Sequence, residues 1–258
     1  SGSDDFDRFV TALGSDQLCA IGSAARALDR LDDPRAEILL IKRLESLREK
    51  SSDFIARQFA EVMKETKNEE WAQHRAEDAF GGAIQSIVKA LTRLGHQTSV
   101  PALREALETG PQQEAADGLA RLQDHSSVDR ILELYWTGKI EIDPLIVLND
   151  SRILLQARAR MYDDARACHL LACKGDPVDK EFMLHLLRQG HPDGARWAAA
   201  THDPDAAKLL TSVIGYADGK GLMEVAFALG SFRDFSLIPT LRKRFGARYG
   251  GFWATPFL

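Results

Sequence analysis

Cysteine and histidine are the side chains in this sequence best suited to nucleophilic or metal chemistry. Cys168 and Cys173 lie five residues apart, whereas zinc-binding and redox cysteine pairs are usually three apart. His185 and His191 lie six apart and His202 follows, so these histidines lack the i, i+4 spacing that points two ligands to one side of a helix. We therefore expect no metal site, and reduced thiols as in a cytoplasmic protein.

The sequence also lacks the short motifs of common enzyme classes. It contains no GxSxG, HExxH or GxGxxG motif and no complete phosphate-binding loop. Residues 218–221 (Asp-Gly-Lys-Gly) resemble the end of such a loop, but the upstream glycine and the Ser or Thr that would meet magnesium are missing. We expect a protein without catalytic residues and without a cofactor.

Composition is that of an ordinary folded protein. The chain has 258 residues, 45% hydrophobic and 28% charged. No run of 18 apolar residues occurs, and the opening SGSDDFDRF has neither a basic nor an apolar signal region, so we expect no membrane span and a cytoplasmic location. Residues 1–150 carry 27 acidic and 18 basic side chains, whereas 151–258 carry 11 and 15, a polarity that can steer a charged partner.

A repeated sequence pattern indicates the elements that position the side chains discussed above. The segments KALTRLGHQTSVPALREAL and FALGSFRDFSLIPTLRKRF align without a gap. In both, a small residue (Ala90, Ala228) is followed four positions later by a bulky apolar residue, and then by a turn and the apolar positions of a second helix. Four further segments of this kind begin at Ala27, Gly118, Leu170 and Trp197. The pattern predicts pairs of helices.

Aspartate recurs at one position of this repeat, directly at the predicted turn. The position holds Asp33, Asp124, Asp176, Asp203 and Asp234, with His96 in the remaining copy. Asp accepts hydrogen bonds from the unpaired N–H groups at the start of a helix, and in three copies a proline follows at the first helical position. We expect helix caps rather than catalytic carboxylates. Because one helix pair cannot bury its apolar stripe alone, the copies predict an α-solenoid.

The segments ALTRLGHQTSVPALREAL and ALGSFRDFSLIPTLRKRF resemble HEAT repeats, in particular the short bacterial HEAT-like type also found in phycobilin lyases. The resemblance covers 27–47 and 90–245 with gaps. It implies an all-α, right-handed α-solenoid of HEAT-like helix pairs, whose second helices line a concave surface that holds a partner. We expect a cloning remnant at 1–3, one solenoid domain over 4–248, and an aromatic cap or tail over 249–258.

The function that we expect is protein binding. A scaffold, adaptor or inhibitor would hold a partner protein on the concave face, and the acidic residues 1–150 favour a basic partner. Immunity proteins against nucleic-acid-degrading toxins work in this manner, and some are HEAT-like. The candidate partner-binding residues are Lys42, Arg43, Arg104, Glu105, Asp129, Glu133, Trp136, Arg158, Lys208 and Trp253.

Two alternatives come from other classes of HEAT-like protein. Alkylpurine DNA glycosylases grip DNA with a basic face, for which this chain offers Arg152, Arg158, Arg160 and Arg166 near Tyr135, Trp136 and Tyr162, and Arg242, Lys243, Arg244 and Arg248 further on. A lyase-like enzyme would place Cys168, Cys173 or His169 near a tetrapyrrole. The iron-binding deoxyhypusine hydroxylases use His-Glu pairs, and no histidine here precedes a glutamate.

Two regions fit the repeat less well. Residues 69–94 have the apolar spacing of one long amphipathic helix, but Gly81 and Gly82 lie in its middle, where glycine costs roughly 1 kcal/mol relative to alanine. We expect a break or kink there. Residues 136–166 show the least regular pattern.

Overall fold

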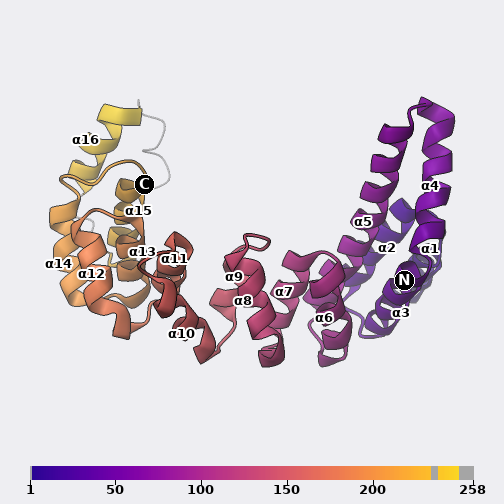
Figure 1. The fold of residues 1–258 in the computed structure, drawn as a ribbon, viewed down its shortest axis with the longest axis horizontal. Helices are drawn as coiled ribbons and strands as arrows, with labels where there is room; N and C mark the ends of the chain where they lie inside the picture. Colours follow the sequence, from indigo (N-terminus) through magenta and orange to yellow (C-terminus); the bar gives the residue numbers. More distant parts are fainter. Residues whose placement is uncertain (1, 234–237, 250–258) are drawn as a thin grey trace. The chain divides into compact units, whose positions relative to one another are not determined.

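The computed structural model describes residues 2–233 and 238–249 of the chain, with side chains described over 4–233 and 238–243. All regular secondary structure within these residues is helical. The chain divides into two compact units, residues 1–150 and residues 151–258. Figure 1 shows each unit as a stack of helices joined by short connections, with α4 (Ser51–Thr66) and α5 (Glu69–Leu94) the long helices of the first unit.

The first unit begins with α1 (Gly2–Leu13), and its repeats are built from the helices that follow. These are α2 (Leu18–Leu31), α3 (Arg35–Glu49), α4 (Ser51–Thr66), α5 (Glu69–Leu94), the 3₁₀ turn η1 (Gln97–Ser99), α6 (Val100–Thr109), α7 (Gln112–Arg121), η2 (His125–Ser127), α8 (Val128–Trp136) and α9 (Asp143–Val147).

The second unit continues the same scheme. It contains α10 (Ser151–Arg160), α11 (Ala165–Lys174), η3 (Pro177–Asp179), α12 (Lys180–Arg188), α13 (Pro192–Thr201), α14 (Pro204–Val213), α15 (Gly219–Ser231) and α16 (Ile238–Tyr249). The six predicted copies of the repeat coincide with the pairs α2/α3, α5/α6, α7/α8, α11/α12, α13/α14 and α15/α16, so the all-α repeat architecture is confirmed.

Each of these first helices is followed by one residue in the left-handed backbone region. These residues are Asp32, Gly95, Gln123, Gly175, His202 and Arg233, with φ between 51° and 67°. All six lie at the same repeat position, directly before the aspartate column. Only two of them are glycine, the residue that adopts this conformation without steric cost. The turn geometry is therefore repeated more faithfully than the residue type.

The aspartate column caps helices as predicted in three copies. Asp33 accepts from the N–H of Arg35 at 2.9 Å, Asp176 from Val178 at 2.8 Å, and Asp203 from Asp205 at 2.9 Å. Asp124 instead accepts from the hydroxyls of Ser126 and Ser127. Asp234 lies outside the described residues.

Close packing explains the small residues of the first helices. A Cβ atom on Gly194 of α13 would lie 2.3 Å from the backbone nitrogen of Leu187 in α12, and one on Gly118 of α7 would lie 2.6 Å from Thr92 Oγ1 in α5. Alanines of the first helices are also buried, at 24, 25, 115 and 116 in the first unit and at 195 and 198 in the second. Short side chains let the helix backbones approach, and the larger apolar residues fill the space between layers.

The expected break at the glycine pair was wrong. Helix α5 runs without interruption from Glu69 to Leu94, and no other atom lies within 4 Å of a Cβ built on Gly81 or Gly82. Figure 1 shows α5 beside α4 over its first half. No helix in the described part of the chain has the length and apolar character needed to cross a membrane.

Candidate functional site

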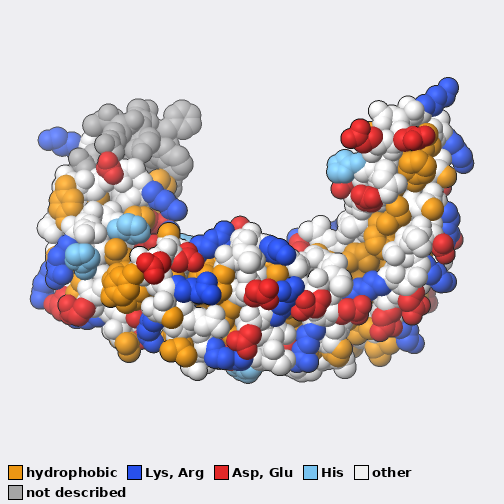
Figure 2. Space-filling model, in the orientation of Figure 1, with side chains coloured by type: hydrophobic (Ala, Val, Ile, Leu, Met, Phe, Trp, Pro, Cys, Tyr) orange, Lys and Arg blue, Asp and Glu red, His pale blue; other side chains and the backbone are white. Residues whose placement is uncertain are grey.

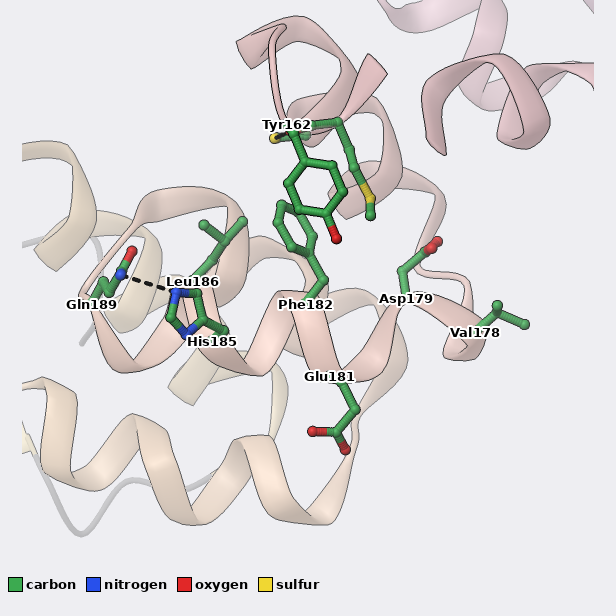
Figure 3. A pocket seen from close by; sticks show the side chains of 10 residues that line it. Tyr162, Val178, Asp179, Glu181, Phe182, His185, Leu186 and Gln189 are labelled. Carbon is green, nitrogen blue, oxygen red and sulfur yellow. Dashed lines mark hydrogen bonds between the residues drawn. The ribbon is translucent and has the colours of Figure 1, made fainter. Parts of the chain in front are cut away.

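The second unit contains an open pocket of about 710 Å³ between the turn that follows α10 and the exposed side of α12. Its wall is formed mostly by apolar side chains, with polar groups at the edges (Figure 3). The lining residues are Met161, Tyr162, Cys168, Val178, Asp179, Glu181, Phe182, His185, Leu186 and Gln189.

An aromatic pair forms the centre of this pocket. Tyr162 lies on the α10–α11 turn and meets Phe182 of α12 edge to face, with ring centroids 5.5 Å apart. Tyr162 is 78% exposed, and Val178 of η3 is 77% exposed. Figure 2 shows hydrophobic surface over the part of the second unit that holds α12. Exposed aromatic and aliphatic side chains that gather in a hollow are typical of a protein-binding site.

The acidic side chain in the wall is held by an arginine. Asp179 is buried and accepts from Arg158 of α10, with Nε–Oδ1 at 2.8 Å and Nη2–Oδ2 at 3.1 Å. Arg158 also lies 3.2 Å from Asp176, and these hydrogen bonds raise its pKa. Both carboxylate oxygens of Asp179 accept from one guanidinium, so this pair ties the η3 turn to α10.

Two further polar groups of the pocket are also bonded within the chain. His185 contacts the Gln189 amide at 3.1 Å, one helical turn away (Figure 3). The Cys168 thiol donates to the Met161 carbonyl at 2.9 Å, and burial raises its pKa. The apolar wall and the exposed side chain of Glu181 remain as binding surface, and the apolar wall suits an inserted hydrophobic side chain.

The candidate residues of the first unit lie on its second helices, and several are engaged in ion pairs. Arg104 of α6 donates to Asp124, at 2.9 Å and 2.6 Å, and this contact lowers the pKa of Asp124 to about 2. Glu105 pairs with Arg48 of α3 at 2.6 Å. Glu133 of α8 pairs with Arg130 at 2.7 Å. Figure 2 shows acidic and basic side chains intermingled over α6 to α8.

The other candidates of this unit differ in exposure. Lys42 and Asp129 are exposed on α3 and α8, and Asp129 has an interaction partner within the chain. Arg43 is partly buried, donates to the Ser15 carbonyl and stacks over Phe54, with 5.3 Å from its guanidinium carbon to the ring centroid. Trp136 is partly buried and packs against Tyr135 with centroids 4.8 Å apart.

In the second unit the structure places Arg158 beside the pocket and leaves Lys208 exposed on α14, 3.5 Å from Asp205. Trp253 and the expected aromatic cap or tail fall outside the described residues, apart from the backbone of Tyr249. The binding roles of all ten candidates stay predictions. The pocket residues Val178 and Phe182 were missed, although a large apolar residue directly after the Asp-Pro turn could have indicated an exposed hydrophobic position.

Four of the arginines proposed for nucleic-acid contact have interactions within the chain. Arg158 is held by two aspartates, and Arg152, Arg160 and Arg166 each have an interaction partner within the chain.

Comparison with protein families identifies residues 85–109 as a PBS lyase HEAT-like repeat. This segment covers the end of α5, η1 and all of α6, which is the second of the six copies described above. The search of curated proteins found no match.

Proposed function

We propose that this HEAT-like repeat protein is a non-enzymatic scaffold that binds a partner protein, and that the pocket beside α12 receives an apolar side chain of that partner. The observation that supports it is the Tyr162–Phe182 pair in a pocket whose lining also includes the exposed Val178. These side chains lie in an open hollow, while the cores of the helix pairs are filled by other residues. Burying such a cluster against a partner is favourable at about 25 cal/mol per Å² of apolar surface.

The charge distribution supports a basic partner. Residues 1–150 have a formal balance of −9, from 27 acidic and 18 basic side chains. Fields of this kind raise the rate of encounter with an oppositely charged protein. An adaptor or an inhibitor of a basic protein, as in the immunity-type hypothesis, fits this polarity. The partner would be steered by charge and anchored by the apolar pocket.

Affinity capture from a lysate of the source organism tests the proposal. The bait variants are Val178→Asp and Tyr162→Asp, because both side chains are highly exposed and their replacement leaves the core intact. Ile38→Asp serves as the matched control, since Ile38 is an aliphatic residue of α3 that is 56% exposed and lies in the other unit. We expect a stoichiometric protein that binds the wild type and the control, resists nuclease, and is lost from both pocket variants.

The same experiment addresses nucleic-acid binding. Contacts to phosphates release counterions, so nucleic-acid binding weakens steeply as salt rises, whereas an apolar pocket contact does not. Recovery of nucleic acid alone, lost at moderate salt and unchanged in the pocket variants, would contradict the proposal and favour the arginine-rich alternative.

A further inference from the structure

A cysteine, a histidine and an aspartate form a connected row outside the pocket. Cys173 and His169 lie one turn apart on α11, with the cysteine sulfur 4.0 Å from His169 Nε2. The other ring nitrogen, Nδ1, lies 3.0 Å from Asp193 Oδ1 on α13. The proposed binding function uses none of these three side chains, and their order is that of a thiol, a base and the group that orients the base.

The aspartate end of the row is fixed by its surroundings. Asp193 is only 6% exposed, and Arg196 Nη1 lies 2.9 Å from Oδ1. The same Nη1 is 2.5 Å from His169 Nδ1, and both nitrogens lie within hydrogen-bonding distance of Oδ1 of Asp193. Arg196 is anchored in turn by Glu224 of α15. These contacts set the orientation of the imidazole ring, and with it the direction of Nε2 toward the sulfur.

The electrostatics favour a protonated imidazole. The hydrogen bond with Asp193, followed by the contact with Cys173, raises the pKa of His169 to about 9, although burial and the charge of Arg196 oppose the shift. Asp193 remains ionised because the histidines at 169 and 191 and Arg196 outweigh the effect of burial and lower its pKa. A cation placed beside a cysteine sulfur stabilises the thiolate, which is the reactive form.

The charged and titratable groups on the helices that carry this row come from α11, α13 and α15. α11 contributes His169 and Lys174, and burial lowers the pKa of Lys174. The α13 segment contributes Asp193 and Arg196, with His191 at its start. α15 contributes Glu224 through Arg196. Cys173 and His169 are both partly exposed, so a small reagent can reach them.

We propose that Cys173 is a modification site for a low-molecular-weight disulfide, with His169 and Asp193 as its positioning residues. The Cys173 thiolate attacks one sulfur of the disulfide, the protein–reagent S–S bond forms, and the reagent's own S–S bond breaks. The departing thiolate takes the proton from His169 Nε2, which leaves a neutral imidazole still bonded to Asp193 through Nδ1–H. Protein thiol and disulfide thus become mixed disulfide and free thiol, with no net change in oxidation state.

The chain carries its own control thiols. Cys19 is exposed on α2, and Cys168 is partly buried, donates to the Met161 carbonyl and has its pKa raised by burial. Cys19 therefore shows how fast an exposed thiol reacts without the His169 contact, and Cys168 shows how fast a partly buried thiol reacts.

The experiment uses the reduced full chain and glutathione disulfide as the probe, with peptide mapping by mass spectrometry at timed intervals. We expect Cys173 to form the mixed disulfide about tenfold faster than Cys19 at neutral pH. Cys168 should form it more slowly than Cys173. His169→Gln and Asp193→Asn should slow Cys173 about tenfold near neutral pH, while leaving Cys19 unchanged. Circular dichroism confirms that each variant is folded.

A pH profile separates activation from simple access. If His169 assists the attack, the pH dependence of the rate at Cys173 should change in His169→Gln, whereas the pH dependence of the rate at Cys19 should not. Equal rates at Cys173 and Cys19 in the wild type would overturn the proposal. So would a His169→Gln variant that keeps the wild-type rate and profile.

Discussion

Glu37 and Lys180 occupy the same position in their repeats and bind the same turn position of the next copy with opposite charge. Each lies ten residues after the first residue of its copy, Ala27 or Leu170. Glu37 Oε2 contacts His96 Nδ1 at 2.8 Å, and Lys180 Nζ contacts Asp203 Oδ2 at 2.9 Å. One geometric contact between consecutive repeats is thus made by an acid and a histidine in the first unit, and by a lysine and an acid in the second.

Replacing the buried acid of this contact should destabilise the first unit. Glu37 is 4% exposed and accepts from the Ser99 hydroxyl as well as from His96. Glu37→Gln removes the charge but keeps the shape, and we expect a loss of about 1–3 kcal/mol in the free energy of unfolding. Chemical denaturation measures it, with Glu45→Gln, an exposed acid on the same helix, as the control. Equal stability of the two variants would show that the contact contributes nothing.

The charge reversal can also be tested directly. Glu37→Lys alone places a lysine beside His96 and Ser99. It should destabilise the first unit more than Glu37→Gln does, because the new buried ammonium group has no acidic partner. Adding His96→Asp copies the arrangement of Lys180 with Asp203 and should recover part of the loss. A double variant no more stable than Glu37→Lys alone would contradict the equivalence of the two positions.

The pH dependence of Glu37 follows from the sign of its shift. Burial opposes its ionisation, but hydrogen bonds from Ser99, Thr98 and His96 outweigh burial and lower its pKa below 4.5. A carboxyl whose pKa is lowered by folding stabilises the folded state at pH values above its pKa in the unfolded chain. This contribution is lost as pH falls through its pKa in the folded chain. The stability difference between wild type and Glu37→Gln should therefore narrow on acidification below about pH 4.5.

The repeats were predictable because they depend on local rules that leave a pattern in the sequence. Helical spacing of apolar residues and capping aspartates located six helix pairs at their observed places. The left-handed residue of each turn was not recognised, because glycine occupies only two of the six positions. The contacts between repeats were also missed, since partners such as Glu37 and His96 are 59 residues apart and no local rule connects them.

The left-handed turn positions give a matched pair of substitutions. Asp32 has φ 51° and is exposed, so Asp32→Gly relieves the backbone cost and should raise the free energy of unfolding by a few tenths to about 1 kcal/mol. Gly95 has φ 67° at the equivalent position, and Gly95→Ala should lower the free energy of unfolding by about 1 kcal/mol. Thermal unfolding of both variants checks the opposite signs, and two shifts of the same sign would contradict the assignment.

Arg158 separates a structural role from a binding role. Its guanidinium holds Asp179, whose side chain is 5% exposed, so Arg158→Ala leaves a buried carboxylate without its cation. We expect a loss of about 2–4 kcal/mol in the stability of the second unit. Lys208→Ala, which removes a side chain that is 80% exposed, should change stability by less than about 0.5 kcal/mol. An Arg158→Ala variant with wild-type melting behaviour would show that the ion pair with Asp179 contributes nothing to the stability of the second unit.

The candidate site was less predictable than the fold for the same reason. Tyr162 was noticed only as an aromatic near arginines, and Phe182 looked like an ordinary apolar position of α12. Their meeting requires the α10–α11 turn to lie over α12, which depends on how consecutive repeats stack. Pairwise stacking of this kind is fixed by packing rather than by any short motif.

The His169–Asp193 pair predicts a stability change at alkaline pH. The hydrogen bond with Asp193 raises the pKa of His169 from 6.5 to about 9. The contribution of this hydrogen bond to the free energy of unfolding is fully present below the pKa of His169 in the unfolded chain. It is lost as pH rises through the pKa of His169 in the folded chain. Urea unfolding of wild type and His169→Gln should therefore differ most near pH 6 and converge above about pH 9. A constant difference across this range would show that the imidazole acts only through packing.

Two glycines within helices should respond oppositely to replacement by alanine. Gly82 lies in the middle of α5 with no atom within 4 Å of an added Cβ, so Gly82→Ala should stabilise the first unit by about 1 kcal/mol through helix propensity alone. A Cβ on Gly194 would lie 2.3 Å from the Leu187 nitrogen, so Gly194→Ala must push α12 and α13 apart. We expect a loss of at least about 2 kcal/mol, because the clash is with backbone rather than with a movable side chain. Differential scanning calorimetry would show the two shifts, and a destabilised Gly82→Ala variant would show that the first-unit helix needs flexibility at that point.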